Sequence, residues 1–354
     1  MKHPFLRLAL PSLLTLALGY AEAMTPSPGC GSPGLTSGTF SLEHAGLTRM
    51  VRIHVPAAYD INQPTKLVML FHGWGGNEDE FLDNARVTFE ANARGYILVA
   101  PRGVGSGPPD NRLNAWSFPG STTGLDGDGR NPRVPGDTAA ICDPLTTPDY
   151  TYPSCAGIAA NTCAWTHCQT DDVAFTLALA EYLNANLCVD LSNVFASGGS
   201  NGGMFVWSLG QASASAPTFR AIAPLIGLPH RAYLNGPGKP SDMPVLLVTG
   251  RNDTTVPPGA WRNPYYTTTS DGDVFYYASA TAITRVWAQA HGCNTATRAS
   301  PFDDGRPDTD CRTYCTQDTG WPRVLDCRLG MGHRYQLNRT WSLIMDFFDQ
   351  QSAQ

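Results

Sequence analysis

Three residues have the side-chain types and the chain order needed for nucleophilic acyl chemistry: Ser200, Asp253 and His333. Ser200 is the centre of a Gly-Gly-Ser-Asn-Gly pentapeptide at 198–202, directly after the strand-like run 191–197. A serine on a sharp strand-to-helix turn exposes its oxygen, and the next main-chain N–H can then face a developing oxyanion. Glycines suit such a turn because it leaves little space for Cβ atoms. The alternative is a structural turn, since 35 glycines make chance matches common.

The acid and the histidine must follow the serine in that order, each after a later strand. Residues 243–250 are apolar and partly β-branched, which predicts a buried strand, and Asp253 lies in the loop that leaves it. Capping of a loop turn is the alternative role for this aspartate. Asp242 precedes the same strand and would therefore lie at its wrong end. Position favours Asp253 as the acid.

Two histidines follow Asp253 in the chain. His291 ends a helix-like segment, where a cation favours the helix dipole, and this structural role accounts for it. His333 follows the strand-like run 323–329 and lies in Gly-Met-Gly-His at 330–333. Glycines before a histidine suit a loop that must return an imidazole to a serine. We therefore predict His333 as the base.

A further turn could supply a second oxyanion donor. The apolar run 66–71 leads into His-Gly-Trp-Gly-Gly at 72–76. In lipases and esterases, a turn of this kind provides a main-chain N–H to the oxyanion hole. We expect the N–H of Trp74 to act together with that of Asn201. His72 is predicted to be structural, hydrogen-bonded beneath the turn.

The elements that would position these residues alternate along the chain, which predicts an α/β fold with a mostly parallel sheet covered on both faces. Serine, acid and histidine at successive strand ends indicate the α/β-hydrolase fold. The stretch 38–55 has the alternation of an antiparallel edge hairpin. Strands are predicted at about 49–55, 67–71, 96–100, 193–197, 221–226, 244–249 and 323–329. Helices are predicted at about 79–93, 172–186, 203–211, 278–290 and 340–350.

The N-terminal residues have the features of a secretory signal peptide. Residues 1–23 combine a basic start, an apolar run and a small-x-small sequence at 21–23. The apolar run is too short to span a bilayer, although a retained anchor is the alternative. We expect a secreted protein with an exposed leader at 24–37 and one catalytic domain at 38–354.

All ten cysteines follow the predicted cleavage site, and their even number in an exported chain predicts up to five disulfides. Cys168 and Cys188 flank a helix-like stretch and could pair. Cys293 could pair with Cys315 or Cys327. A zinc site formed by residues 155, 163, 167 and 168 is the less favoured alternative, because spacing and compartment argue against it.

Residues 103–170 are rich in Gly, Pro, Asp and Thr, contain four cysteines and have no sustained periodicity. So long a loop in a compact domain usually has a function, and its position in the chain places it near the carboxyl edge of the sheet. We predict a disulfide-stapled, cap-like insertion. Trp116 and Trp165 within it, and Tyr265 beyond Asp253, are predicted to form aromatic walls of a substrate site. The alternative is that the aromatic residues of the insertion form its own small core.

Charge and composition limit the partners. The formal charge is −6, charged residues make up 15% of the chain, and no basic stripe is present. This argues against nucleic acid and membrane surfaces as partners. Residues 126–131 resemble part of a calcium loop but lack its closing glutamate, so a solvated turn is favoured and no metal or other cofactor is predicted. Oligomeric state does not follow from the sequence.

These motifs resemble those of the secreted feruloyl esterases and polyhydroxybutyrate depolymerases among the α/β-hydrolases. The resemblance covers residues 38–102 and 168–349, including the turn at 72–76, Asp-Asp-Val at 171–173, the segment 188–204 and the loop at 250–257. It departs after His333, where family members often have a tryptophan and a proline and this chain has Arg334-Tyr335-Gln336.

The resemblance implies a serine carboxylic-ester hydrolase that forms an acyl-enzyme. It implies feruloyl-type esters on plant cell-wall polysaccharide as the first expectation, and polyhydroxybutyrate or another polyester as the alternative. A non-catalytic carbohydrate-binding protein on a hydrolase scaffold and a serine peptidase are remote alternatives. The first usually lacks one of the three reactive residues, and the second often has a propeller domain for which the length leaves no space.

Overall fold

The computed structural model describes most of the chain beyond the predicted signal peptide. The residues described are 24–105, 113–118, 121, 141–143, 145–147, 150, 152–155, 163–168, 171–231, 243–263, 265–269, 272–300, 302, 304–315 and 322–352. The expected signal peptide at 1–23 and the calcium-loop-like residues 126–131 lie outside them. Among the described residues, no helix has both the length and the apolar character required to cross a membrane.

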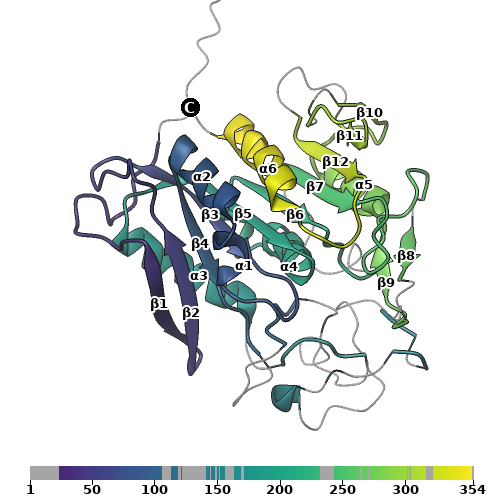
Figure 1. Cartoon of the computed structure of the whole chain (residues 1–354), viewed down its shortest axis with the longest axis horizontal. Helices are drawn as coiled ribbons and strands as arrows, with labels where there is room; N and C mark the ends of the chain where they lie inside the picture. Colours follow the sequence, from purple (N-terminus) through teal and green to yellow (C-terminus); the bar gives the residue numbers. More distant parts are fainter. Residues whose placement is uncertain are drawn as a thin grey trace, which may run out of the picture.

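A ten-stranded sheet with the order β1-β2-β4-β3-β5-β6-β7-β12-β11-β10 forms the centre of the fold (Figure 1). Its strands are β1 (Gly38–His44), β2 (Leu47–His54), β3 (Thr65–Phe71), β4 (Tyr96–Pro101), β5 (Val189–Gly199), β6 (Ala221–Leu225), β7 (Val245–Gly250), β10 (Arg298–Ala299), β11 (Thr309–Thr313) and β12 (Val324–Leu329). The pairs from β4 to β12 are parallel, and the pairs at both edges are antiparallel. The predicted mostly parallel sheet and edge hairpin are therefore confirmed.

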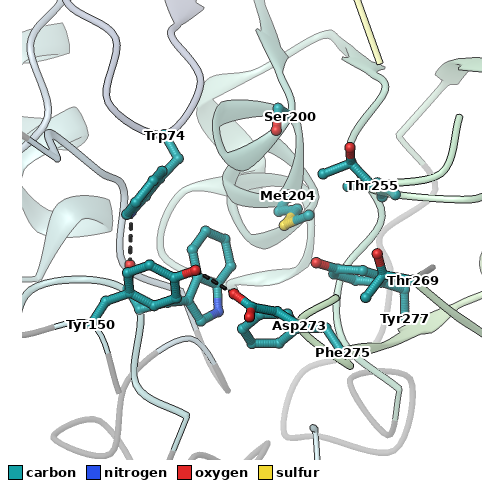
Figure 2. A pocket seen from close by; sticks show the side chains of 11 residues that line it. Trp74, Tyr150, Ser200, Met204, Thr255, Thr269, Asp273, Phe275 and Tyr277 are labelled. Atoms are coloured by element: carbon teal, nitrogen blue, oxygen red, sulfur yellow. Dashed lines mark hydrogen bonds between the residues drawn. The ribbon is translucent and has the colours of Figure 1, made fainter. Parts of the chain in front are cut away.

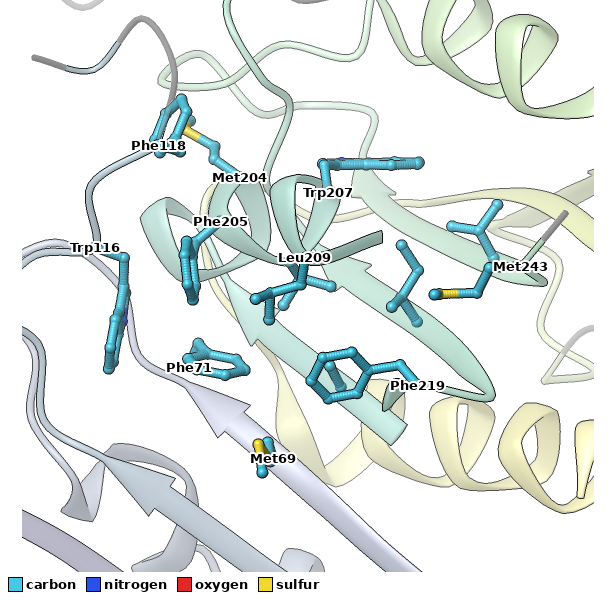
Figure 3. Packing of buried hydrophobic residues seen from close by; sticks show 14 of the residues in the cluster. Met69, Phe71, Trp116, Phe118, Met204, Phe205, Trp207, Leu209, Phe219 and Met243 are labelled. Carbon is cyan, nitrogen blue, oxygen red and sulfur yellow. The ribbon is translucent and has the colours of Figure 1, made fainter. Parts of the chain in front are cut away.

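Helices cover both faces of this sheet and explain why its central strands are buried. Along β3, Leu67 and Met69 face one core cluster, whereas Val68 faces the other. The first cluster includes side chains of α3 (Asp172–Asn186), α4 (Asn201–Gln211) and α5 (Ala280–Ala290), and Figure 3 shows part of it. The second includes side chains of α1 (Asp79–Leu82), α2 (Ala85–Arg94) and α6 (Leu337–Gln351). Strands β4, β6, β7 and β12 are consequently buried along their whole length.

Three features differ from the predicted elements. The helix expected at 79–93 is two helices, because Asn84 has an extended conformation and its side chain caps α2 by accepting the Arg86 N–H. The antiparallel strands β10 and β11 were not predicted. The separate hairpin of β8 (Tyr266–Thr268) and β9 (Tyr276–Ala278) was also missed. Strands β8, β9 and β10 have only two or three residues each, too few for an alternating pattern to mark them.

All ten cysteines form disulfides, which leaves no thiolate for zinc. The pairs are Cys30–Cys188, Cys142–Cys163, Cys155–Cys168, Cys293–Cys315 and Cys311–Cys327. The Cys293–Cys315 alternative is thus confirmed, and the suggested Cys168–Cys188 pair is wrong. The 15-residue helix α3 lies between Cys168 and Cys188 and spans roughly 22 Å, far beyond the reach of a disulfide.

The stretch 24–37 is mostly exposed but is joined to the sheet. Its Cys30 is bonded to Cys188 just before β5. Nearby, the Ser27 hydroxyl donates a hydrogen bond of 2.6 Å to the Leu187 carbonyl. This segment therefore runs along the protein surface at the amino end of β5.

Candidate active site

Ser200 lies on a strained turn between β5 and α4. Its backbone has φ 52° and ψ −117°, a conformation that costs energy in a non-glycine residue. A Cβ on Gly202 would meet the carbonyl oxygen of Phe71, and one on Gly198 would approach the main chain of Gly202 to 2.7 Å. The flanking glycines are thus required because β3, β5 and α4 approach so closely. The turn has the geometry of a nucleophile elbow.

Asp253 follows β7, as predicted, and only 4% of its surface is exposed. One carboxylate oxygen, Oδ1, accepts hydrogen bonds from the N–H groups of Thr255 (3.0 Å) and Val256 (2.8 Å). The other oxygen, Oδ2, lies 2.8 Å from Nδ1 of His333. The local loop therefore fixes one side of the carboxylate and directs the other toward the imidazole.

His333 follows β12, which pairs in parallel with β7. Main-chain bonds join the two loops, from Asn252 N–H to the Met331 carbonyl (3.0 Å) and from Arg251 N–H to the Leu329 carbonyl (2.8 Å). The Nε2 of His333 lies 2.9 Å from the Ser200 hydroxyl oxygen. The structure thus brings the three sequence-predicted residues into one continuous hydrogen-bonded chain.

The turn after β3 is held by His72, which is buried as expected. Its Nε2 accepts the Gly103 N–H (2.8 Å), and its Nδ1 lies 2.7 Å from the Gly73 carbonyl oxygen. An acceptor at Nε2 requires the proton on Nδ1, so the ring is neutral. Burial lowers the pKa of His72 to about 4. The imidazole supports the turn and does not face Ser200.

Asn201 begins α4, and its side chain is also buried. The side-chain amide accepts the Trp116 N–H (2.7 Å) and donates to the Trp116 carbonyl (3.0 Å). The first N–H groups of a helix have no acceptor within that helix. The main-chain N–H of Asn201 is therefore well suited to a negative oxygen beside Ser200, while its side chain has a structural role.

A cavity of about 230 Å³ lies beside Ser200 (Figure 2). Its described lining residues are Trp74, Tyr150, Trp165, Ser200, Met204, Thr255, Val256, Thr269, Asp273, Phe275 and Tyr277. Trp74 contributes its indole, whose Nε1 donates to the Trp165 carbonyl (3.0 Å) and to the Tyr152 hydroxyl (3.0 Å). Five of the eleven described lining residues are aromatic, so flat rings form a large part of the cavity wall.

Trp165 lines this cavity, whereas the other two predicted wall residues do not. Trp116 is completely buried: its ring stacks on Phe205 with centroids 5.4 Å apart, and its Nε1 donates to the His72 carbonyl. The bonds from Asn201 hold the Trp116 main chain against α4 and direct the indole into the core. Tyr265 is 74% exposed and lies outside the cavity lining. The structure therefore does not place these two residues in the described lining of this cavity.

Another part of the cavity wall is formed where the insertion meets the β8–β9 hairpin. The sequence did not predict this contact. Asp143 N–H donates to the Val274 carbonyl, and Tyr276 N–H donates to the Ile141 carbonyl, both at 2.8 Å. The Cys142–Cys163 disulfide reinforces the same region. Residues such as Tyr150 and Asp273 lie in irregular segments, so no periodic signal in the sequence could have identified them.

A buried ion pair anchors the insertion to the sheet. Asp172 contacts Arg49 (3.1 Å) and His167 (2.8 Å), and it accepts the Ser117 N–H (2.8 Å). Burial opposes its ionisation, but the charges of His167 and Arg49 and these hydrogen bonds hold the pKa of Asp172 below its ordinary value. Asp171 caps α3 by accepting the N–H groups of its first turn. The Asp-Asp-Val sequence is thus explained structurally.

The strand order, the helices on both faces and the elbow between β5 and α4 define the chain as an α/β-hydrolase. No family model matches the sequence. The chain is 26% identical over 238 residues to a probable feruloyl esterase C of Aspergillus niger, covering 65% of this chain and 63% of that protein. It is 26% identical over 255 residues to feruloyl esterase C of Emericella nidulans, covering 70% of each.

Two solved structures share the fold at low sequence identity. Acetyl xylan esterase from Aspergillus awamori has a TM-score of 0.53 and 12% identity, covering 88% of this chain and 99% of its own. Native pOPH has a TM-score of 0.50 and 16% identity, covering 92% and 90%. These two structures concern the fold, and they confirm the α/β-hydrolase fold predicted from the sequence. The curated relatives confirm the resemblance to the feruloyl esterases.

Proposed function

We propose that this protein is a secreted serine hydrolase of carboxylic esters that acts through an acyl-enzyme and releases a feruloyl-type acyl group. The observation that carries the proposal is the continuous chain from Ser200 through His333 to Asp253, with contacts of 2.9 and 2.8 Å. These distances are within hydrogen-bond reach, as proton transfer from a nucleophile requires. No cofactor enters the proposed reaction.

In the first step, the Ser200 oxygen attacks the ester carbonyl carbon while Nε2 of His333 takes the hydroxyl proton. Asp253 keeps the imidazole proton on Nδ1 and stabilises the imidazolium that forms. The tetrahedral intermediate collapses when His333 returns the proton to the departing alcohol. Water then repeats the sequence on the acyl-enzyme and releases the acid and free Ser200.

The main-chain N–H groups of Asn201 and Trp74 are proposed to bind the oxygen that becomes negative in both tetrahedral intermediates. One begins α4 and the other lies in the turn held by His72. Preorganised donors cost no reorganisation during the reaction, and losing one such donor typically raises the barrier by ~2.7–4 kcal/mol.

The cavity supports a small aromatic acyl group. Its volume of about 230 Å³ is below the ~300–1,000 Å³ typical of pockets for drug-sized ligands, so it suits one acyl unit. Aromatic walls favour a planar ring, and the curated relatives are named feruloyl esterases. The alcohol part is proposed to be plant cell-wall polysaccharide. Secretion is proposed from the signal-like residues 1–23 and is supported by the five disulfides.

Hydrolysis of methyl ferulate and of amorphous polyhydroxybutyrate, measured in parallel, tests the proposal. Wild type should release ferulate, and Ser200→Ala should lose about 10⁶-fold in kcat while keeping its circular dichroism spectrum. Ser41→Ala, on the exposed face of β1, is the matched control and should keep full activity. Substantial turnover by Ser200→Ala would overturn the serine mechanism. Serine-dependent release of hydroxybutyrate alone would instead identify a polyester depolymerase.

A further inference from the structure

A carboxylate lies within the otherwise largely aromatic cavity, away from the reactive serine. In Figure 2, Met204 is drawn between Ser200 and Asp273, and all three line the cavity. The Tyr150 hydroxyl donates a hydrogen bond to Oδ2 of Asp273. The proposed acyl-transfer mechanism uses neither side chain, so the pair requires an explanation of its own.

The pair occupies a firmly held junction between the insertion and the hairpin. The Thr147 hydroxyl donates to the Val274 carbonyl (3.0 Å) and accepts the Val274 N–H (2.8 Å), next to Asp273 in the chain. On the other side, the ring of Tyr150 packs edge-on against Trp74 with centroids 5.1 Å apart. The carboxylate therefore has a defined position relative to the aromatic walls.

We propose that Asp273 and Tyr150 form a hydroxyl subsite, in which Asp273 accepts a hydrogen bond from a hydroxyl group at the end of the acyl chain remote from the ester. The ligand class is a neutral aromatic acyl group with a ring hydroxyl opposite the chain that leads to the ester, such as 4-hydroxycinnamoyl. This inference rests on the proposed esterase function, because Ser200 must hold the other end of the same group.

The chemistry of the two side chains suits this role. An ionised carboxylate accepts only, and its two oxygens offer about four lone-pair directions. Tyr150 uses one direction on Oδ2, and Oδ1 makes no hydrogen bond within the described residues. Burial, together with Asp273, raises the pKa of Tyr150 to about 12, so the phenol remains a donor at neutral pH. The Tyr150 hydroxyl therefore donates to Oδ2 of Asp273 and leaves Oδ1 to face a ligand.

Discrimination follows from the cost of leaving Oδ1 of Asp273 without a hydrogen bond when a ligand displaces water from it. A substrate without the hydroxyl displaces water from Asp273 and offers no hydrogen bond in return. A hydrogen bond to a charged group corresponds to about a 10- to 100-fold preference. An acyl group that ends in a carboxylate should be rejected, because like charges would meet.

The test compares kcat/KM for methyl 4-hydroxycinnamate with that for methyl cinnamate and methyl 4-methoxycinnamate. Wild type should prefer the hydroxylated ester by about 10- to 100-fold. Asp273→Leu, which removes both acceptors, should bring this ratio near one. Asp273→Asn retains a neutral acceptor and should give an intermediate ratio, and Tyr150→Phe should lower the ratio less. Asp346→Asn, on the exposed side of α6, is the matched control and should keep the wild-type ratio.

The ratio separates recognition from a merely structural role, since a loosened wall would slow all three esters equally. A wild-type ratio near one, or an equal loss on all esters in the Asp273 variants, would overturn the subsite. If Asp273→Leu does not fold, the ratio of kcat/KM values in Asp273→Asn tests the subsite, because asparagine preserves the shape of the side chain. Hydrolysis of p-nitrophenyl acetate by wild type reports the serine chemistry separately. Failure to hydrolyse any ester would contradict the proposed function itself.

Discussion

The three predicted catalytic residues and the cavity wall are built in different ways. Ser200, Asp253 and His333 each lie within a few residues of the carboxyl end of a buried strand, namely β5, β7 and β12. Tyr150, Asp273 and their neighbours instead come from irregular segments joined by hydrogen bonds and a disulfide. The comparison teaches that the strands place the predicted catalytic residues, whereas long-range contacts between loops shape the cavity beside them.

The two regions should respond differently to change. A substitution at the strand ends should reduce the chemical step while leaving the cavity intact. A substitution in the wall should change which substrate is preferred and how tightly it binds. The expected effects below run from the largest to the smallest.

Asp253→Asn should lower kcat for methyl ferulate by about 10⁴-fold, because the amide would favour the wrong imidazole tautomer. Steady-state kinetics measure the effect, and KM should change far less than kcat. Asp83→Asn, whose side chain is 70% exposed, provides the control. Near-full activity in Asp253→Asn would mean that another residue is the acid, and the role of the strand ends would have to be revised.

Acid should destabilise the cavity wall through His230. This ring is buried, accepts the Trp165 indole N–H (3.0 Å) and stacks on Tyr277, and burial lowers its pKa to about 3. An imidazole with an ordinary pKa of about 6.5 takes up a proton in the unfolded chain first, so stability falls as the pH drops below that value. By pH 4, this one group should reduce the free energy of unfolding by about 3 kcal/mol.

Urea unfolding at pH 7, 5 and 4 measures this dependence. His230→Phe should remove the share of the pH dependence of unfolding that is due to this ring. The buried His72, with a pKa of about 4, should still contribute to that dependence. An unchanged pH dependence in His230→Phe would show that the histidine is not held neutral in the folded protein.

Removing the Cys142–Cys163 disulfide with a double serine variant should loosen the wall and raise KM for methyl ferulate about tenfold. The bond closes a loop with a sequence separation of 21, so its loss should also reduce the free energy of unfolding by about 3 kcal/mol. The Cys30–Cys188 double serine variant is the control, since that bond ties only the leader to β5. Equal KM changes in both variants would contradict the proposal that the Cys142–Cys163 disulfide acts on substrate binding through the cavity wall.

Tyr265→Ala should change kcat/KM by less than twofold, because this side chain is 74% exposed and outside the cavity lining. Trp165→Ala, which removes an aromatic wall, should reduce kcat/KM for methyl ferulate about tenfold. Comparable losses in the two variants would mean that the surface tyrosine takes part in binding after all.

Much of the framework could be predicted from the sequence, because its signals are local. Buried parallel strands appear as short apolar runs, and their alternation with helical segments indicates the sheet. Gly198 and Gly202 around Ser200 mark a turn that only small residues allow, and the glycines before His333 marked its loop in the sequence. The pairing of β12 with β7 could not be read from the sequence, yet the position of His333 after both the acid and a later strand-like run predicted it as the base without that pairing.

The residues of the cavity wall could not be predicted from the sequence, and the reason is physical. Trp116 and Trp165 are equally plausible as wall residues in the sequence, yet the Asn201 side chain directs one into the core and Trp74 contacts the main chain of the other at the cavity. The disulfide partner of Cys168 likewise depended on the length of α3 and not on nearness in the chain.

By itself, the sequence determined the class of fold, and it predicted the order of nucleophile, acid and base and the resemblance to feruloyl esterases and polyhydroxybutyrate depolymerases. Local chain chemistry specifies each of these, since a strand end or a glycine-flanked turn needs only its immediate neighbours. Only the tertiary structure decided that Asp273 meets Tyr150 inside the cavity, and that Trp116 does not line it. Those contacts join segments far apart in the chain, so they exist only once the sheet has brought the segments together.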